Sequence, residues 1–151
     1  MRTRFAACAI SVALVAPAIA ADAQMIVNDA NGSVNQVADR LTAAAEKAGA
    51  MIVARVDHAQ NAASVDTDMA PTTVVIFGNP KIGTPIIMSD KRAGLDLPIR
   101  VLIWKEGDRT KIGYLDPAVL AERYDLDETA KESVRKMTGA LEKLTAAAAK
   151  Q

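Results

Sequence analysis

The sequence predicts one small domain in which helices pack on a β-sheet, and three observations support this fold class. Residues 72–77 are a run of β-branched and aromatic residues typical of a strand. Residues 99–115 have the pattern of two strands joined by a short turn. Residues 33–48 and 127–148 carry apolar side chains at helical spacing. The length of 151 residues fits a single domain once a targeting segment is subtracted.

The first 23 residues have the pattern of a cleavable secretory signal peptide. Two arginines give a positively charged start, and the apolar run 5–15 is too short to span a bilayer. Small residues follow, and cleavage after Ala20 or after Ala23 fits equally well. We therefore expect a periplasmic or secreted protein in which residues 24–151 form the single mature domain.

Composition restricts what the mature domain can do. The one cysteine of the chain, Cys8, lies within the predicted signal. We therefore expect no disulfide, thiol nucleophile or thiolate metal site in the mature domain. Cleavage after Ala20 would remove two arginines and no acidic residue, which leaves 18 − 2 = 16 basic residues against 18 acidic ones, a net charge of −2. Nucleic-acid binding normally depends on a basic face, so we expect no nucleic-acid partner. No later segment is long and apolar enough for a membrane span.

The first half of the domain is predicted to alternate strands and helices. A short strand at 25–27 precedes a helix that begins with the capping-box pattern of Ser33 and Gln36. Residues 51–56 favour a largely buried strand. Residues 58–65 have small apolar residues at helical spacing and predict a short helix close against the sheet.

The second half begins with the most strand-like segment. Residues 72–77 lack polar alternation, which predicts a central strand covered on both faces. We expect Thr84 to cap the next helix, with Pro85 at its first position. In the hairpin that follows, we expect Trp104 to pack against Ile112 or Tyr114.

Two helices are predicted to complete the chain. Asp116 and Pro117 have the pattern of a cap and first-turn proline for a helix that ends at Tyr124. Asp127 is a plausible cap for a long helix, whose apolar stripe we expect to cover the domain's own sheet rather than another subunit.

Four segments between Asp57 and Leu126 resemble the bacterial domain of unknown function 302 family: DHAQNAASV, PTTVVIFGNPKIGTPIIM, LDLPIRVLIWKEG and IGYLDPAVLAERYDL. The resemblance implies an α+β fold, in which an antiparallel sheet with TATA-binding-protein-like topology is covered by helices, often in a homodimer. It implies no biochemical activity. The exported start and the alanine-rich end from Glu128 onward depart from commoner members.

His58 is the only histidine and follows the end of a predicted strand. As a general base it would need a partner within hydrogen-bond reach, and Asp57, Ser64 and Asp66 show no known catalytic spacing. A capping or core-edge role is favoured, and we assign no catalytic residue.

A copper site is an alternative use of the same histidine. His58 with a thioether from Met25, Met51, Met69 or Met88 would offer soft ligands. The chain has no clustered histidine or methionine motif, and methionines in apolar segments usually fill gaps in packing. We therefore assign no metal site and leave the cofactor open.

A predicted loop between strand and helix is the favoured binding segment. Its residues Gly78, Asn79, Lys81, Gly83 and Thr84 combine backbone amides with a lysine, which together can hold an anion. The spacing differs from that of a phosphate loop, and a turn that only orients the helix is the alternative.

The sequence thus predicts a non-catalytic exported domain, expected to be a homodimer. It would bind a small ligand or an envelope protein through a surface formed by His58 and residues 78–84. One alternative is a periplasmic copper or haem-associated binding protein that uses His58. Another is an enzyme of unrecognised type with His58 as its base. The sequence does not specify the ligand.

Overall fold

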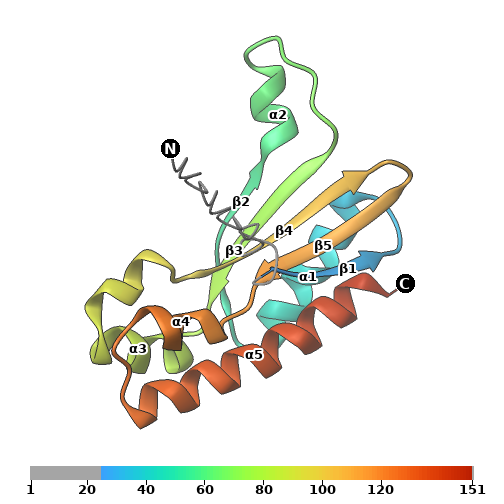
Figure 1. The fold of residues 1–151 in the computed structure, drawn as a ribbon. Helices are drawn as coiled ribbons and strands as arrows, with labels where there is room; N and C mark the ends of the chain where they lie inside the picture. Colours follow the sequence, from blue (N-terminus) through green and yellow to red (C-terminus); the bar gives the residue numbers. More distant parts are fainter. Residues whose placement is uncertain (1–24, 151) are drawn as a thin grey trace, which may run out of the picture.

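A computed structural model of the protein describes residues 25–150, so the predicted signal peptide at 1–23 lies outside the described residues. The strands form one sheet in the order β1-β5-β4-β3-β2, and all neighbouring strands are antiparallel. Figure 1 shows α1 and α5 running alongside this sheet, whereas α2 projects beyond the end of β2. The predicted α+β fold is confirmed at this level, whereas the TATA-binding-protein-like topology stays a prediction. The elements are β1 (Met25–Ala30), α1 (Val34–Lys47), β2 (Met51–Asp57), α2 (His58–Ala63), β3 (Thr72–Gly78), α3 (Pro80–Ser89), the 3₁₀ helix η2 (Lys91–Leu95), β4 (Ile99–Glu106), β5 (Arg109–Leu115), α4 (Ala118–Arg123) and α5 (Glu128–Ala149).

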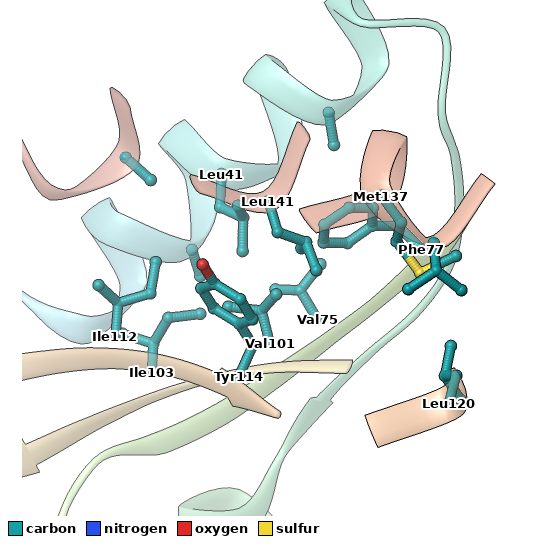
Figure 2. Packing of buried hydrophobic residues seen from close by; sticks show 14 of the residues in the cluster. Leu41, Val75, Phe77, Val101, Ile103, Ile112, Tyr114, Leu120, Met137 and Leu141 are labelled. Atoms are coloured by element: carbon teal, nitrogen blue, oxygen red, sulfur yellow. The ribbon is translucent and has the colours of Figure 1, made fainter. Parts of the chain in front are cut away.

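The core lies between one face of the sheet and the helices α1 and α5, which also pack on each other. Figure 2 shows Leu41 of α1 and Leu141 of α5 above Val75, Val101 and Tyr114 of the sheet. All five side chains are buried. The last helix therefore covers the domain's own sheet, as predicted. No helix among residues 25–150 is long and apolar enough to cross a membrane.

The predicted caps of the two long helices are confirmed. The Ser33 hydroxyl oxygen accepts a hydrogen bond from the Gln36 backbone N–H at 3.3 Å, and the Gln36 side-chain oxygen accepts one from the Ser33 N–H at 2.9 Å. At α5, an Asp127 carboxylate oxygen accepts from the Ala130 N–H at 2.8 Å. Such caps satisfy backbone donors that a helix start leaves free, and each stabilises by about 1 kcal/mol.

Two predictions about strand burial are wrong. In β3, Thr73 and Val75 point into the core, whereas Val74 and Ile76 are only half-buried because no described helix covers the opposite face. Strand β2 is an edge strand rather than a buried one, and its Met51 is 60% exposed. Short apolar runs do not reveal on which faces a strand will be covered.

The predicted hairpin is confirmed, but the predicted packing of Trp104 against Ile112 or Tyr114 is wrong. Trp104 of β4 lies opposite Lys111, on the face of the sheet away from the helices. Its ring covers Gly113, where an added Cβ would lie 3.2 Å from Trp104 Cζ3. The large aromatic anchor of the core is instead Tyr114, which is 2% exposed.

Candidate functional site

Helix α3 begins one turn earlier than the sequence suggested. Asn79 is its cap, since the side-chain oxygen accepts a hydrogen bond from the Lys81 backbone N–H at 3.0 Å, and Pro80 takes the first helical position. The predicted cap at Thr84 is therefore wrong, and Pro85 lies inside the helix. Both Asn79-Pro80 and Thr84-Pro85 have the sequence pattern of a helix start, and the structure uses the first.

An open pocket of about 300 Å³ lies where β3 passes into α3. Six elements reach it: the end of α1, the start of β2, the end of β3, the first residue of β4, and one side each of α3 and α5, together with the segment before β4. We call this the β3–α3 pocket. Its lining residues are Ala48, Ala50, Met51, Val53, Phe77, Gly78, Asn79, Pro80, Ile82, Gly83, Thr84, Ile87, Leu97, Pro98, Ile99, Met137, Ala140, Leu141 and Leu144.

The chemical character of the β3–α3 pocket is apolar. Phe77, Met137 and Leu141 form its inner part and belong to the core cluster, at the end of the core where Phe77 and Met137 are labelled in Figure 2. Among residues 25–150, only Asn79 and Thr84 contribute polar side chains to it, and no charged side chain of this range lines it. The pocket therefore favours an apolar group over a bare ion.

The structure brings four of the six predicted site residues to this pocket. Gly78, Asn79, Gly83 and Thr84 line it, although Gly83 and Thr84 belong to helix α3 rather than to a loop. Lys81 is exposed on the first turn of the same helix and does not line the pocket.

The remaining predicted residue, His58, does not share this surface. It begins α2 directly after Asp57, which pairs with Thr73, whereas Gly78 pairs with Met51 at the other end of β2. Gly78 lies five positions after Thr73 along β3, which is roughly 17 Å of strand. Figure 1 shows α2 standing away from the body of the molecule. The expected surface combining His58 with residues 78–84 is therefore wrong.

His58 also lacks the neighbours that a metal site would need. Among residues 25–150, no three His, Cys, Asp or Glu side chains form a group able to hold a metal ion. Met51 lies at the far end of β2 from His58, and Met25 and Met88 belong to β1 and α3. Only Met69, in the segment that follows α2, is close to His58 along the chain.

The carboxylates of Asp90 and Asp96 form hydrogen bonds between elements near the pocket. Asp90, at the end of α3, accepts from Arg92 at 2.6 Å and from the Asp125 backbone N–H at 3.4 Å. The hydrogen bond from Arg92 lowers the pKa of Asp90 to about 2. Asp96 is partly buried, which raises its pKa, but hydrogen bonds led by that from Tyr124 at 2.7 Å outweigh this and leave it lowered. Both carboxylates stay charged at neutral pH and join these segments to the end of α4 and the residues just after it.

The sequence does not predict the pocket residues outside the 78–84 segment. Those from α5, such as Met137 and Leu144, belong to an apolar stripe whose spacing predicts only packing on the sheet. Met51 and Val53 of β2 were expected to be buried. The stripe was the only signal in the sequence, and it does not distinguish a filled contact from a gap between two helices.

Comparison with known proteins places the chain in a family. The model of the family described as "Domain of unknown function DUF302" matches residues 26–144. A crystal structure of an uncharacterized conserved DUF302 protein from Bacillus stearothermophilus matches with a TM-score of 0.74 and 18% identity. It covers 82% of this chain and 97% of that chain. At this identity the likeness concerns the fold alone.

Relatives in Brucella are longer. "Fluoride-specific ion channel FluC 1" of Brucella suis is 36% identical over 130 residues, which cover 83% of this chain and 51% of the relative. The protein of the same name in Brucella abortus is also 36% identical, with 48% of its length covered. The chain thus spans about half the length of these relatives. Because the family model spans most of this chain and the fold agrees, the chain belongs to the DUF302 family.

Proposed function

We propose that this DUF302 domain is a non-catalytic binding domain that takes a small apolar ligand into the β3–α3 pocket. The observation that carries the proposal is the pocket itself, about 300 Å³ in volume and lined almost wholly by apolar side chains. Ligand sites in proteins are concave and mostly apolar, with a few polar groups that orient the ligand. Asn79 and Thr84 fill that second role here.

The volume of the pocket limits the size of the ligand. A dry apolar cavity of about 150 Å³ holds one benzene molecule. The β3–α3 pocket has about twice that volume, so about a dozen carbon atoms would fill it. Its inner wall is part of the buried core, and a rigid wall favours binding because little of the protein must be ordered when the ligand enters.

The proposal places the domain in the bacterial envelope. The apolar run after the first two arginines supports export through a signal peptide cleaved after Ala20 or Ala23. The Brucella relatives carry a matching domain within proteins named for an ion channel, which is compatible with a site of action at a membrane. A periplasmic or secreted location follows from the proposal.

The test uses a matched pair of glycine substitutions. An added Cβ at Gly83, which lines the pocket, or at Gly139, which does not, would meet no heavy atom within 4 Å. Gly83→Leu should fill the pocket and weaken the binding of 1-decanol at least tenfold in calorimetric titration. Gly139→Leu should bind as the wild type does. Both glycines lie in helices, so neither change should lower the melting temperature. Equal binding by both variants, or no binding by the wild type, would rule out this site.

The alternatives built on His58 lead to a different experiment. A copper or haem-associated binding protein would need His58 and Met69 to provide the ligands. Protein purified from its native compartment would then contain metal or haem, and His58→Ala would remove it. An enzyme with His58 as its base would lose activity on the same substitution. The β3–α3 pocket would be unaffected in either case, because it lies at the other end of β2.

The homodimer expected from the resemblance also stays a proposal, and it is supported by the face of the sheet that no helix of residues 25–150 covers, which we call the uncovered face. Paired positions on that face form an apolar row across all strands: Val56, Val74, Leu102, Gly113 and Val27. Val27 is 43% exposed. A second copy could cover this row face to face. In a dimer of ordinary size each partner buries about 800 Å² of its surface. Sedimentation equilibrium should show a dimer that Leu102→Glu dissociates, and a monomeric wild type would refute the proposal.

A further inference from the structure

We infer that the ligand of the β3–α3 pocket is a free, single-chain amphiphile of about a dozen carbons with an anionic head. Its chain would lie in the pocket and its head beside Lys81 and Lys143. This inference rests on the proposed function and adds the polarity of the ligand to it. It depends on which side of the pocket is open and on which charged residues lie there.

The pocket opens on one side of α5. Leu141 is buried, with 2% exposure, whereas Ala140 and Leu144 are only half-buried. Residues three and four apart are neighbours on a helix surface, so Ala140 is flanked on its solvent side by Lys136 and Lys143. Lys136 lies 3.9 Å from Glu132 and is therefore partly neutralised. No ion pair with any residue of the described range 25–150 involves Lys143.

Helix α3 places a second lysine on the opposite wall. Thr84 lines the pocket and is exposed, and Lys81 lies one helical turn before it. The core side of α3 is marked by Ile86, which is fully buried, and Lys81 lies on the solvent side of the lining residues. Helices α3 and α5 pack against each other and both line the pocket, so the proposal places the head of the ligand between these two lysines.

Among residues 25–150, no acidic side chain forms an ion pair with either of these lysines. On α1, Glu46 and Lys47 are neighbours before Ala48 and cancel each other. Glu142 lies on a different side of α5, where it lines a separate hollow beside β1. The wall of the pocket is thus apolar and its opening is basic. That combination matches a carboxylate at the end of an aliphatic chain, because a long aliphatic stem is buried while the charged end stays at the edge in contact with water.

The size of the pocket excludes a two-chain membrane lipid as the occupant. Its volume of about 300 Å³ suits one chain of medium length. The ligand class is therefore a free carboxylate with a single chain, such as decanoate. Phosphatidylglycerol vesicles, which carry an anionic head on two long chains, should not bind.

The experiment compares three ligands of equal chain length by calorimetric titration: decanoate, 1-decanol and decyltrimethylammonium. Decanoate should bind about fivefold more tightly than 1-decanol, with the ammonium compound weakest, since exposed ion pairs contribute up to about 1 kcal/mol each. This preference should shrink in 0.5 M salt, because exposed charges are screened. Sodium fluoride alone should not bind.

The matched variants locate the effect. Lys81→Ala combined with Lys143→Ala should remove the preference for decanoate and leave 1-decanol binding unchanged. Lys131→Ala, on the opposite flank of α5 and paired with Glu128 at 3.0 Å, should have no effect on either ligand. Equal affinities for decanoate and 1-decanol would refute the anionic ligand and leave the proposed function standing. Failure of all three ligands would refute both, and binding of vesicles would show a membrane lipid instead.

Discussion

Gly78 and Pro98 approach so closely that a side-chain carbon on Gly78 would lie 3.3 Å from Cβ of Pro98. Both residues line the β3–α3 pocket, one from the end of β3 and the other from the segment that leads into β4. The pocket is therefore bounded here by a contact that only glycine permits without movement. A larger residue would push the Pro98 segment outward or press into the pocket.

Gly78→Ala should accordingly weaken ligand binding more than it weakens the fold. The added methyl group needs a shift of only a few tenths of an ångström, so we expect destabilisation of about 1 kcal/mol, in line with mild overpacking. Binding of 1-decanol should fall severalfold, because the altered wall belongs to the site. Chemical denaturation and calorimetric titration give the two quantities. Unchanged affinity would show that this wall does not contact the ligand.

Leu141→Ala should weaken the fold more than it weakens ligand binding, which is the reverse of the effect expected for Gly78→Ala. Leu141 is 2% exposed and belongs both to the core and to the inner wall of the pocket. Its truncation should cost about 2–5 kcal/mol of unfolding free energy, as is usual for a buried leucine. The enlarged pocket should then favour a longer chain, so the affinity for 1-dodecanol relative to 1-decanol should rise. The same chain-length preference as in the wild type would contradict the placement of Leu141 in the site.

Gly113→Ala tests the uncovered face of the sheet. An added Cβ would lie 2.9 Å from Met25 Cε, 3.0 Å from the Ile26 carbonyl oxygen and 3.2 Å from Trp104 Cζ3. The methionine can move, but the backbone oxygen cannot do so without disturbing the pairing of β1 with β5. We expect a loss of about 1–3 kcal/mol by thermal or chemical unfolding. A neutral effect would mean that the ring of Trp104 does not rest on Gly113.

The pH dependence of stability should reveal Asp90. Its pKa is lowered from 3.8 to about 2, chiefly by the hydrogen bond from Arg92. A lowered carboxyl pKa stabilises the fold above the unfolded value, and this contribution is lost as the pH falls through the folded value. Asp90→Asn should therefore lower the melting temperature at pH 7. The difference from the wild type should shrink between about pH 4 and about pH 2. A difference independent of pH would exclude this ionisation as the cause.

The elements that could be predicted from the sequence are those with a strong local signal. Ser33 with Gln36, and Asp127 before the last helix, mark helix starts through bonds made within one turn. The hairpin of β4 and β5 follows from alternation and a short turn. The family resemblance added the antiparallel arrangement, which local patterns do not specify.

The wrong predictions concern features that depend on tertiary contacts: the burial of strands, the distance between His58 and Gly78, and the pocket. The burial of β2 and β3 depends on which strand lies at the edge and on which face the helices cover, and neither is encoded in a short apolar run. His58 and Gly78 both follow predicted strands, but the antiparallel register of β2 and β3 places them at opposite ends. The pocket depends on the gap between α3 and α5, which no stripe of residues such as Leu141 and Leu144 reveals.

A nuclear magnetic resonance titration of methyl-labelled protein with 1-decanol tests the proposed binding site most directly. Saturable shifts are predicted for methyl groups that line the β3–α3 pocket, including those of Ile82, Ile87, Leu141 and Leu144, while Val27 and Leu102 on the uncovered sheet face should not shift. Saturable shifts confined to Val27 and Leu102, or no saturable shift in any methyl group, would contradict the proposed binding site.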